Sequence, residues 1–292
     1  MHAKNTLLPE TLTLNCGGRL LELQQVRIMG ILNLTPDSFY ASSRIRQVTE
    51  GLQRAERMLQ DGADILDLGA QSSRPGSELL DPSEELKRLL PLLEAIVKEF
   101  PDAIVSIDTF YSKVAEVAGH SGARMINDIS AGDMDPEMLP TVGRLRLPYI
   151  AMHMQGTPRT MQHQPAYSDV VQEVLDYFIG KLEQCRTHGI ADVILDPGFG
   201  FGKTLEHNYR LLARLEAFHM LGRPLLAGLS RKSMIYRLLH TSPEQALNGT
   251  TALNMAALLK GVKLLRVHDV AAAREVVRLA EFYRQQMRFS LI

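Results

Sequence analysis

Short apolar runs recur along the chain, and a polar loop and a segment with apolar residues at helical spacing separate each run from the next. The runs are nearly continuous rather than alternating with polar residues. Such strands are typical of a parallel sheet that is covered on both faces, with the intervening helices as crossovers. We predict eight strands, at 27–34, 64–68, 104–107, 124–126, 148–152, 193–195, 224–228 and 263–267.

Helical periodicity is clearest in five of the intervening segments and weaker in a sixth. Asp81 or Ser83 is the expected N-cap of one helix, and Ser242 followed by Pro243 is the expected start of another. Eight strands alternating with helices predict an α/β protein, a single (β/α)8 TIM barrel. The helices are expected at 46–60, 83–100, 168–188, 243–260 and 270–287, with the weaker one near 136–142.

Two further extended segments precede the first barrel strand. Residues 11–15 and 19–23 flank Cys16, Gly17 and Gly18, which are compatible with a turn. We predict an N-terminal hairpin within residues 1–26 that caps the barrel, followed by a (β/α)8 catalytic domain over 27–292. The length of 292 residues fits one barrel of about 250 residues plus additions better than two domains.

Polar side chains close or follow each predicted strand. The carboxyl ends of all barrel strands meet at one mouth, which is where active sites of such barrels lie. A single polar residue of this kind is often only a turn or a helix cap, but the whole set favours a site. The set is Asn33, Asp67, Asp108, Asn127, His153, Asp196, Ser230 and Arg266 with His268.

The residues at the predicted mouth fall into two chemical groups. Asp108, Asn127 and Asp196 offer acceptors for the N–H groups of a nitrogen-rich heterocycle. Donors for phosphate or carboxylate oxygens are also present, and Asn33 could give a neutral oxygen to Mg²⁺ that otherwise holds water and substrate phosphates. An anionic, phosphorylated heterocycle is therefore the expected substrate. The donors are Arg74, Lys232, Arg266 and His268.

A glycine-rich segment at 196–204 resembles two phosphate-binding motifs but matches neither. The spacing from Gly198 to Lys203 is one residue too short for a P-loop, and the glycines miss the dinucleotide-binding pattern by one position. We interpret the segment as a loop whose glycines let a flat ligand approach the backbone, with Phe201 available to pack on it. A turn that serves only the backbone is the alternative.

Composition and charge exclude several other classes of protein. The 32 basic and 33 acidic side chains give a net charge of −1, so no global field attracts nucleic acid or an anionic membrane. Cys16 and Cys185 form neither a disulfide framework nor a zinc motif. No window approaches the length of a membrane span, and the first ten residues lack the apolar region of a signal peptide. A cytoplasmic location is expected.

The motifs themselves resemble those of dihydropteroate synthases, in the order of that family and over essentially the whole barrel. The first signature is matched at 31–39 and the second at 64–76, the latter reading DILDLGAQSSRPG. The resemblance continues through 106–109 (SIDT), 126–129 (INDI), 152–156 (MHMQG), 196–204, 230–233 (SRKS) and 266–269 (RVHD).

The resemblance implies transfer of a pterin from its pyrophosphate to p-aminobenzoate, with Mg²⁺ as cofactor, small-molecule substrates and a homodimer as the usual assembly. It assigns catalysis to Asp108, Lys232, Arg266 and His268. It assigns pterin binding to Asp108, Asn127, Met152, Asp196 and Lys232. It assigns pyrophosphate binding to Asn33, Ser73, Arg74, Arg266 and His268, with Asn33 as the metal ligand. It assigns p-aminobenzoate binding to Phe39, Ser73, Arg74, Pro75, Phe201 and Ser233.

The chain departs from the family pattern at a few positions. Residues 40–44 read YASSR where the family usually has a serine, an acid and glycines, and Gln71, Ser73 and Leu229 replace a glutamate, a threonine and a small polar residue. The altered segment at 40–44 leaves a noncatalytic pterin-binding paralogue as one alternative. A methyltetrahydrofolate-dependent methyltransferase, which would use the same kind of pterin barrel, is the other. The cationic groups at 230–233 argue against the methyltransferase, because a methyl donor carries no pyrophosphate.

Overall fold

The computed structural model describes residues 12–34, 41–71, 79–161 and 164–289. The strands are β1 (Thr13–Cys16), β2 (Arg19–Glu22), β3 (Arg27–Asn33), β4 (Ile65–Gly69), β5 (Ile104–Asp108), β6 (Met125–Asp128), β7 (Tyr149–Met152), β8 (Val193–Asp196), β9 (Leu226–Ala227) and β10 (Leu264–Val267). The helices are α1 (Ala41–Gln60), α2 (Pro82–Glu99), α3 (Ser112–His120), α4 (Met138–Leu145), α5 (Val170–Thr187), α6 (Leu205–Ala213), the 3-10 helix η1 (Leu215–Leu221), α7 (Ser233–Tyr236), α8 (Leu247–Leu259) and α9 (Val270–Phe289).

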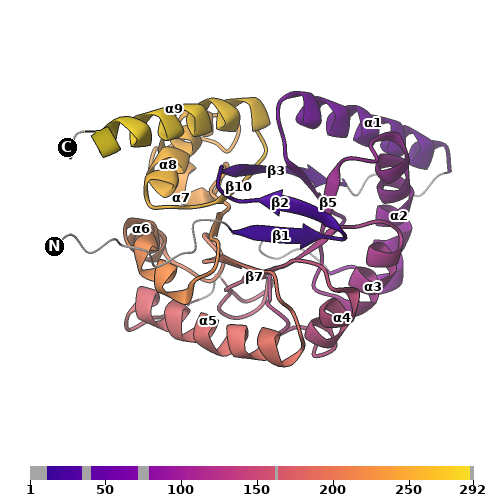
Figure 1. The fold of residues 1–292 in the computed structure, drawn as a ribbon, viewed down its shortest axis with the longest axis horizontal. Coiled ribbons are helices and arrows are strands. Elements are labelled where there is room, and N and C mark those ends of the chain that lie inside the picture. Colours follow the sequence, from indigo (N-terminus) through magenta and orange to yellow (C-terminus); the bar gives the residue numbers. More distant parts are fainter. Residues whose placement is uncertain (1–11, 35–40, 72–78, 162–163, 290–292) are drawn as a thin grey trace.

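The strands β3 to β10 form one parallel sheet in the order β8-β7-β6-β5-β4-β3-β10-β9. The two ends of this order meet at a bridge between Leu195 of β8 and Leu225, just before β9. The N–H of Leu195 also donates to the carbonyl of Pro224 at 3.0 Å. The sheet thus closes into a barrel, and the helices surround it (Figure 1). The predicted (β/α)8 barrel is confirmed.

Alternate side chains of each barrel strand face the helices and the barrel interior, as the period of two requires. One interior layer is apolar and packs against the β1–β2 hairpin, which lies across that end of the barrel (Figure 1). The hairpin therefore plugs one end of the barrel and leaves the other end for a site. The layer and its plug consist of Met29, Ile65, Ile104, Met125, Ile150, Ile194, Leu226 and Leu264 with Leu14, Cys16, Leu21 and Leu23.

The two predicted helix starts have different outcomes. Asp81 is the N-cap of α2, and its carboxylate accepts from the N–H groups of Ser83 and Glu84. The predicted start at Pro243 is wrong, because α8 begins only at Leu247. The guanidinium of Arg231 binds the carbonyls of Pro243 and Glu244 at 2.9 and 2.7 Å, which holds residues 243–246 in turns.

The helices α3 and α6 were not predicted from the sequence. Helix α3 has no side-chain cap, and α6 begins with a capping box between Thr204 and His207, an unusual partner for this motif. Both are short, so neither shows a clear helical period. Within the described ranges, no helix has an apolar stretch long enough to cross a membrane.

Candidate active site

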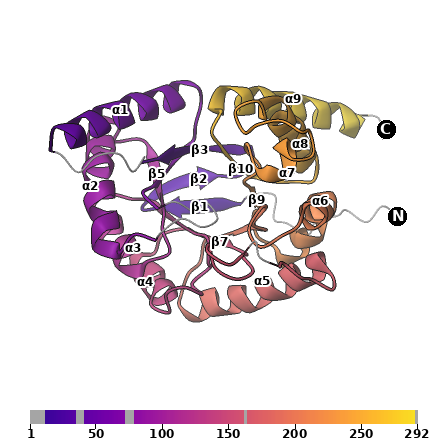
Figure 2. The same cartoon turned by 180° about the vertical axis from the view of Figure 1, so that it is seen from behind.

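The interior positions two residues beyond the apolar layer carry mostly polar groups. Side chains two residues apart on a strand share a face, so these groups point into the same interior, nearer the mouth. This end of the barrel is the one turned toward the viewer in Figure 2, opposite the hairpin. The layer consists of Ile31, Asp67, Ser106, Asn127, Met152, Asp196, Gly228 and Arg266.

Arg266 of β10 binds two acidic side chains, Asp67 of β4 and Asp108 of β5, which lie on strands that are not its neighbours in the sheet. Its Nε donates to Oδ2 of Asp67 and its Nη2 to Oδ2 of Asp108, both at 2.6 Å. Nδ2 of Asn127 donates to the same Oδ2 of Asp67 at 3.0 Å. Burying these charges is tolerated because the cation and the carboxylates compensate one another.

Asp108 is a carboxyl group of this set whose pKa is shifted by burial. Burial raises the pKa of its carboxyl to about 7, and the nearby Arg266 opposes that rise. Near neutral pH the carboxyl therefore lies close to the balance between its acid and its carboxylate. A ligand that presents N–H donors or positive charge to Asp108 shifts this balance toward the carboxylate.

Lys232 and Asp196 converge on Gly228. A Cβ on this glycine would lie 3.6 Å from Nζ of Lys232 and 3.8 Å from Oδ2 of Asp196, so both charged groups border the space above Gly228. Nζ of Lys232 also donates to the carbonyl of Phe199 at 2.5 Å and lies 4.7 Å from the ring centroid of Phe201. Burial lowers the pKa of Lys232 to about 8, against the attraction of Asp196.

Met152 forms an apolar wall beside these polar groups. It is buried in a small cluster with Phe110 and Ile129, and Met154 and Phe201 pack against the same cluster. The cluster is separate from the large core between the barrel and the helices. A flat apolar wall beside hydrogen-bonding groups suits a planar heterocycle, whose faces and edges have these different needs.

His268 and Asn33 lie at other strand ends of the mouth. Nδ1 of His268 lies 3.0 Å from Oγ of Ser230, which fixes the imidazole ring. Burial lowers the pKa of His268 to about 4, so the ring is neutral at physiological pH. Asn33 is exposed. Its Oδ1 and the side chain of Asp108 border the same space above Gly69, because a Cβ on this glycine would lie within 3.6 Å of both.

The remaining predicted site residues are divided between described and undescribed segments. Ser233 is the first residue of α7, directly after Lys232, and Phe201 lies in the loop after β8. Phe39 and the segment of Ser73, Arg74 and Pro75 lie outside the described residues.

Arg231 belongs to the basic segment at 230–233, but its guanidinium is bound by groups of the protein. Its guanidinium makes a two-pronged ion pair with Asp269, with both N–O distances at 2.8 Å. It also binds the carbonyls of Pro243 and Glu244 in the turns that precede α8. Arg231 therefore ties the β9–α7 turn to the end of β10 and to the loop before α8.

Lys203, in the glycine-rich segment that matches no phosphate motif, is a buried link between two loops of the mouth. It is buried, and its Nζ contacts Nδ1 of His153 at 2.9 Å and the carbonyls of His153, Gly198 and Phe201 at 3.0 to 3.2 Å. The amine thus joins the loop after β8, which carries Phe201, to the end of β7. No spacing rule signals this, because the acceptors come from two loops.

The glycines of the same loop serve the backbone. A Cβ on Gly198 would lie 1.9 Å from the carbonyl oxygen of His153, and one on Gly202 would lie 2.4 Å from that of Gln155. Both residues also have positive φ angles, of 71° and 62°. For these two positions the close approach is to the chain itself rather than to a ligand, in contrast to our interpretation of the loop.

Gln71, one of the departures from the family pattern, has a structural explanation. Its Nε2 donates to the carboxylate of Glu85 and to the carbonyl of Leu80, both at 2.9 Å, and its Oε1 accepts from the N–H of Leu80. Burial raises the pKa of Glu85 to about 7. An amide at position 71 can donate to this buried carboxylate, whereas an ionised glutamate would repel it.

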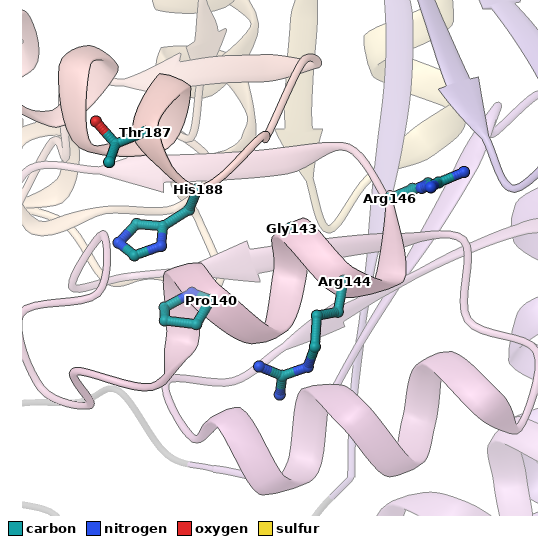
Figure 3. Close-up of a pocket in the computed structure, with 6 residues that line it drawn as sticks. All are labelled: Pro140, Gly143, Arg144, Arg146, Thr187 and His188. Atoms are coloured by element: carbon teal, nitrogen blue, oxygen red, sulfur yellow. The ribbon is translucent and has the colours of Figure 1, made fainter.

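A separate surface pocket lies between α4 and the end of α5 (Figure 3). These helix ends adjoin the starts of the following strands, because the helices run antiparallel to the strands. The pocket therefore lies toward the hairpin end of the barrel, and it contains none of the predicted site residues. Its lining is Pro140, Gly143, Arg144, Arg146, Thr187 and His188.

Comparison with known proteins agrees with this geometry. Residues 29–268 match the family described as pterin binding enzyme. Dihydropteroate synthase of Escherichia coli K12 is 43% identical over 266 residues, which are 90% of this chain and 94% of that protein. The structure of Yersinia pestis dihydropteroate synthase in a sulfonamide complex superposes with a TM-score of 0.88 at 41% identity, covering 94% of this chain and 100% of that one.

A structure that contains the reaction product is also similar. Xanthomonas albilineans dihydropteroate synthase in complex with 7,8-dihydropteroate has a TM-score of 0.82 at 36% identity, covering 93% of this chain and 98% of that one. The chain belongs to the dihydropteroate synthase family of pterin-binding enzymes, the transferases that condense 6-hydroxymethyl-7,8-dihydropterin pyrophosphate with p-aminobenzoate and release pyrophosphate in folate biosynthesis.

Proposed function

We propose that the barrel mouth holds the pterin through Asp108, Asn127, Asp196 and Lys232, with Met152 against its ring face. The observation that carries this assignment is the convergence at the barrel mouth of these acceptors, one amine and an apolar wall, with Asn127, Met152 and Asp196 at one interior level and Asp108 one step nearer the opening. The edge of a pterin offers both N–H donors and ring nitrogens, which match carboxylates and an ammonium group. Asp108 and Lys232 act here as catalytic residues because they touch the reacting ring system.

The pyrophosphate is assigned to Arg266, His268 and Asn33, with Ser73 and Arg74 from the segment outside the described residues. Arg266 supplies a permanent positive charge and His268 a neutral imidazole N–H donor. Phe201 and Ser233 lie beside Lys232 and are assigned to p-aminobenzoate, together with Phe39 and Pro75.

This arrangement fits a displacement in which the pyrophosphate leaves the carbon attached to the pterin ring. Positive charge develops on the pterin and negative charge on the leaving group. Asp108 stabilises the first charge, and Arg266 and His268 stabilise the second, so preorganised electrostatics supply most of the catalysis. The neutral amine of p-aminobenzoate then attacks the carbon, so that a C–N bond replaces the broken C–O bond, and the nitrogen loses one proton to water or to the released pyrophosphate. No covalent intermediate with the protein is required.

Pyrophosphate release is the direct test of this function. We expect release only when the pterin pyrophosphate and p-aminobenzoate are both present, with one pyrophosphate for each dihydropteroate formed. Pterin binding without release would instead indicate a noncatalytic pterin-binding protein. Methyl transfer from methyltetrahydrofolate would indicate the methyltransferase alternative.

Magnesium is proposed as the cofactor, held by Asn33 and by the pyrophosphate of the substrate. Among the described residues, no cluster of three or more histidine, cysteine or carboxylate side chains could bind a metal ion alone. This fits Mg²⁺, which usually keeps water and substrate phosphates and takes only one or two protein oxygens. When bound, the ion would neutralise negative charge on the leaving group.

The Asn33→Ala variant tests this metal assignment. We expect it to weaken binding of the pterin pyrophosphate by about tenfold, or about 1.4 kcal/mol, in the presence of magnesium. Binding of 6-hydroxymethylpterin, which has no pyrophosphate, should hardly change. Calorimetry with both ligands makes the comparison. Equal weakening of binding of both ligands would show that Asn33 has only a structural role at the end of β3.

A homodimer is proposed through α8 and α9. Four apolar side chains of α9 are more than 45% exposed and recur at helical spacing: Leu279, Phe282, Tyr283 and Met287. Leu247 and Leu259 of the neighbouring α8 are also exposed. Exposed apolar side chains at helical spacing on one helix are typical of protein interfaces. Sedimentation equilibrium would measure the dimer, and a monomer at all concentrations would exclude it.

A further inference from the structure

The buried Asp67 has no assigned role in the site, yet it lies in the same interior layer as Asn127 and Arg266, which are proposed to bind substrate. It is 0% exposed, so it does not contact a ligand at the mouth. Its Oδ2 accepts from two side chains at once, Nε of Arg266 at 2.6 Å and Nδ2 of Asn127 at 3.0 Å. One oxygen atom thus joins a residue proposed to bind pyrophosphate to one proposed to bind the pterin.

We propose that Asp67 is a positioning residue that sets the amide orientation of Asn127 and the placement of the Arg266 guanidinium. This inference rests on the proposed roles of those two residues. It concerns two hydrogen bonds that bring together β4, β6 and β10, strands that are not neighbours in the sheet order.

The amide of Asn127 has two ends that differ in chemistry. A carboxylate can only accept hydrogen bonds, so Asp67 selects the NH₂ end of the amide. The oxygen of Asn127 is then the end that remains to accept from a pterin N–H group. Without Asp67 the amide can rotate, and in half of its orientations it presents the wrong end to the ligand.

The guanidinium of Arg266 is held in a fork between two carboxylates. Asp67 binds its Nε and Asp108 binds its Nη2, so the plane of the guanidinium is fixed from two sides. Asp108 also faces the mouth and is proposed to bind the pterin. Asp67 is therefore the partner that can hold Arg266 in place while Asp108 contacts the substrate.

Two substitutions of Asp67 separate the hydrogen bonds from the charge. Asp67→Ala removes the acceptor, and we expect the Kd for 6-hydroxymethylpterin to rise by about tenfold, as for the loss of one well-placed hydrogen bond. Asp67→Asn keeps an oxygen that can accept from Asn127 but removes the charge that holds Arg266. It should recover pterin affinity to within about threefold of wild type, while kcat/KM for the pterin pyrophosphate stays about tenfold lower.

Ser106→Ala is the matched control. Ser106 lies opposite Asp67 on β5 at the same level, is also buried, and has no hydrogen bond from its hydroxyl among the described residues. The control should leave both constants unchanged. The KM for p-aminobenzoate should change in none of the three variants, because neither Asn127 nor Arg266 is assigned to it.

A double-mutant cycle shows whether Asp67 acts through Asn127. In an Asn127→Ala background, Asp67→Ala should weaken pterin binding by less than about twofold further, because the residue it orients is gone. Full additivity would overturn the proposal, as would wild-type pterin affinity in Asp67→Ala or an equal loss in Ser106→Ala. If Asp67→Ala does not fold, wild-type kcat/KM in Asp67→Asn would overturn it. Each value is a ratio to the wild-type protein, so an inactive wild type would refute the proposed function instead.

Discussion

The Asp196→Asn and Asp108→Asn variants should each lose pterin affinity by about a hundredfold, or 2.7 kcal/mol, while keeping the fold. Both substitutions preserve size but replace a carboxyl group that can ionise with a neutral amide, whose NH₂ end repels an N–H donor. In Asp196→Asn the new oxygen can still accept from the N–H of Gly198, which Asp196 binds at 2.8 Å. Calorimetry with 6-hydroxymethylpterin measures the loss, and near-normal affinity in both variants would exclude the pterin assignment.

Asp64→Asn is the control for loss of a half-buried, ion-paired carboxylate away from the mouth. Asp64 lies at the hairpin end of the barrel, where it pairs with Arg27 at 3.0 Å and Arg274 at 2.7 Å. Its substitution should lower stability without changing pterin affinity. A comparable loss of affinity in Asp64→Asn would mean that any disturbance of the barrel weakens binding.

The same assignment predicts a pH dependence. Burial raises the pKa of Asp108 to about 7, and the ionised form is the one that accepts from the pterin. Wild-type affinity should therefore fall as the pH falls through about 7. The part of this dependence centred near 7 should be absent in Asp108→Asn.

The Arg266→Met variant should show the largest combined loss of stability and turnover. The substitution leaves Asp67 and Asp108 buried without their cation, which costs about 3–5 kcal/mol of unfolding free energy. It also removes a donor for the leaving pyrophosphate, so kcat should fall by about 100- to 1,000-fold. Urea denaturation and steady-state kinetics measure the two effects separately.

The cause of the stability loss in Arg266→Met can be tested by its pH dependence and by a second substitution. Without Arg266, the cation that lowers the pKa of Asp108 is gone, so its pKa rises further. The deficit should be largest above that pKa and shrink as the pH falls and the carboxyl becomes protonated. Asp67→Asn in the Arg266→Met background should restore part of the stability. A deficit independent of pH and of Asp67 would reflect lost packing of the arginine stem instead.

The sequence alone was sufficient to predict the barrel and the end of the barrel at which the candidate site lies. Nearly continuous apolar strands such as Ile104–Asp108 indicated a sheet covered on both sides, and their polar ends indicated the mouth. The period of two along a strand then places Asn127 two residues beyond Met125, on the same face. These are local properties of the chain, so they are legible without knowledge of the fold.

The start of a helix is harder to predict from the sequence where a distant residue binds its first turn. The N-cap at Asp81 depends only on the next three residues, and its prediction is confirmed. The start of α8 depends on Arg231, which is 12 and 13 residues from the carbonyls that it binds. A local rule for caps has no access to such a partner, so the prediction at Pro243 was wrong.

The pairing of polar groups within the site was decided only by the tertiary structure. Arg266 meets Asp67 and Asp108 across separations of 199 and 158 residues, and Asn127 meets Asp67 across 60. Lys203 likewise became a buried link between two loops only when His153, 50 residues away, was brought beside it. Sequence periodicity determines which residues face the interior. Closure of the barrel determines which of them touch, because it brings strand ends that are distant in the chain within hydrogen-bonding distance.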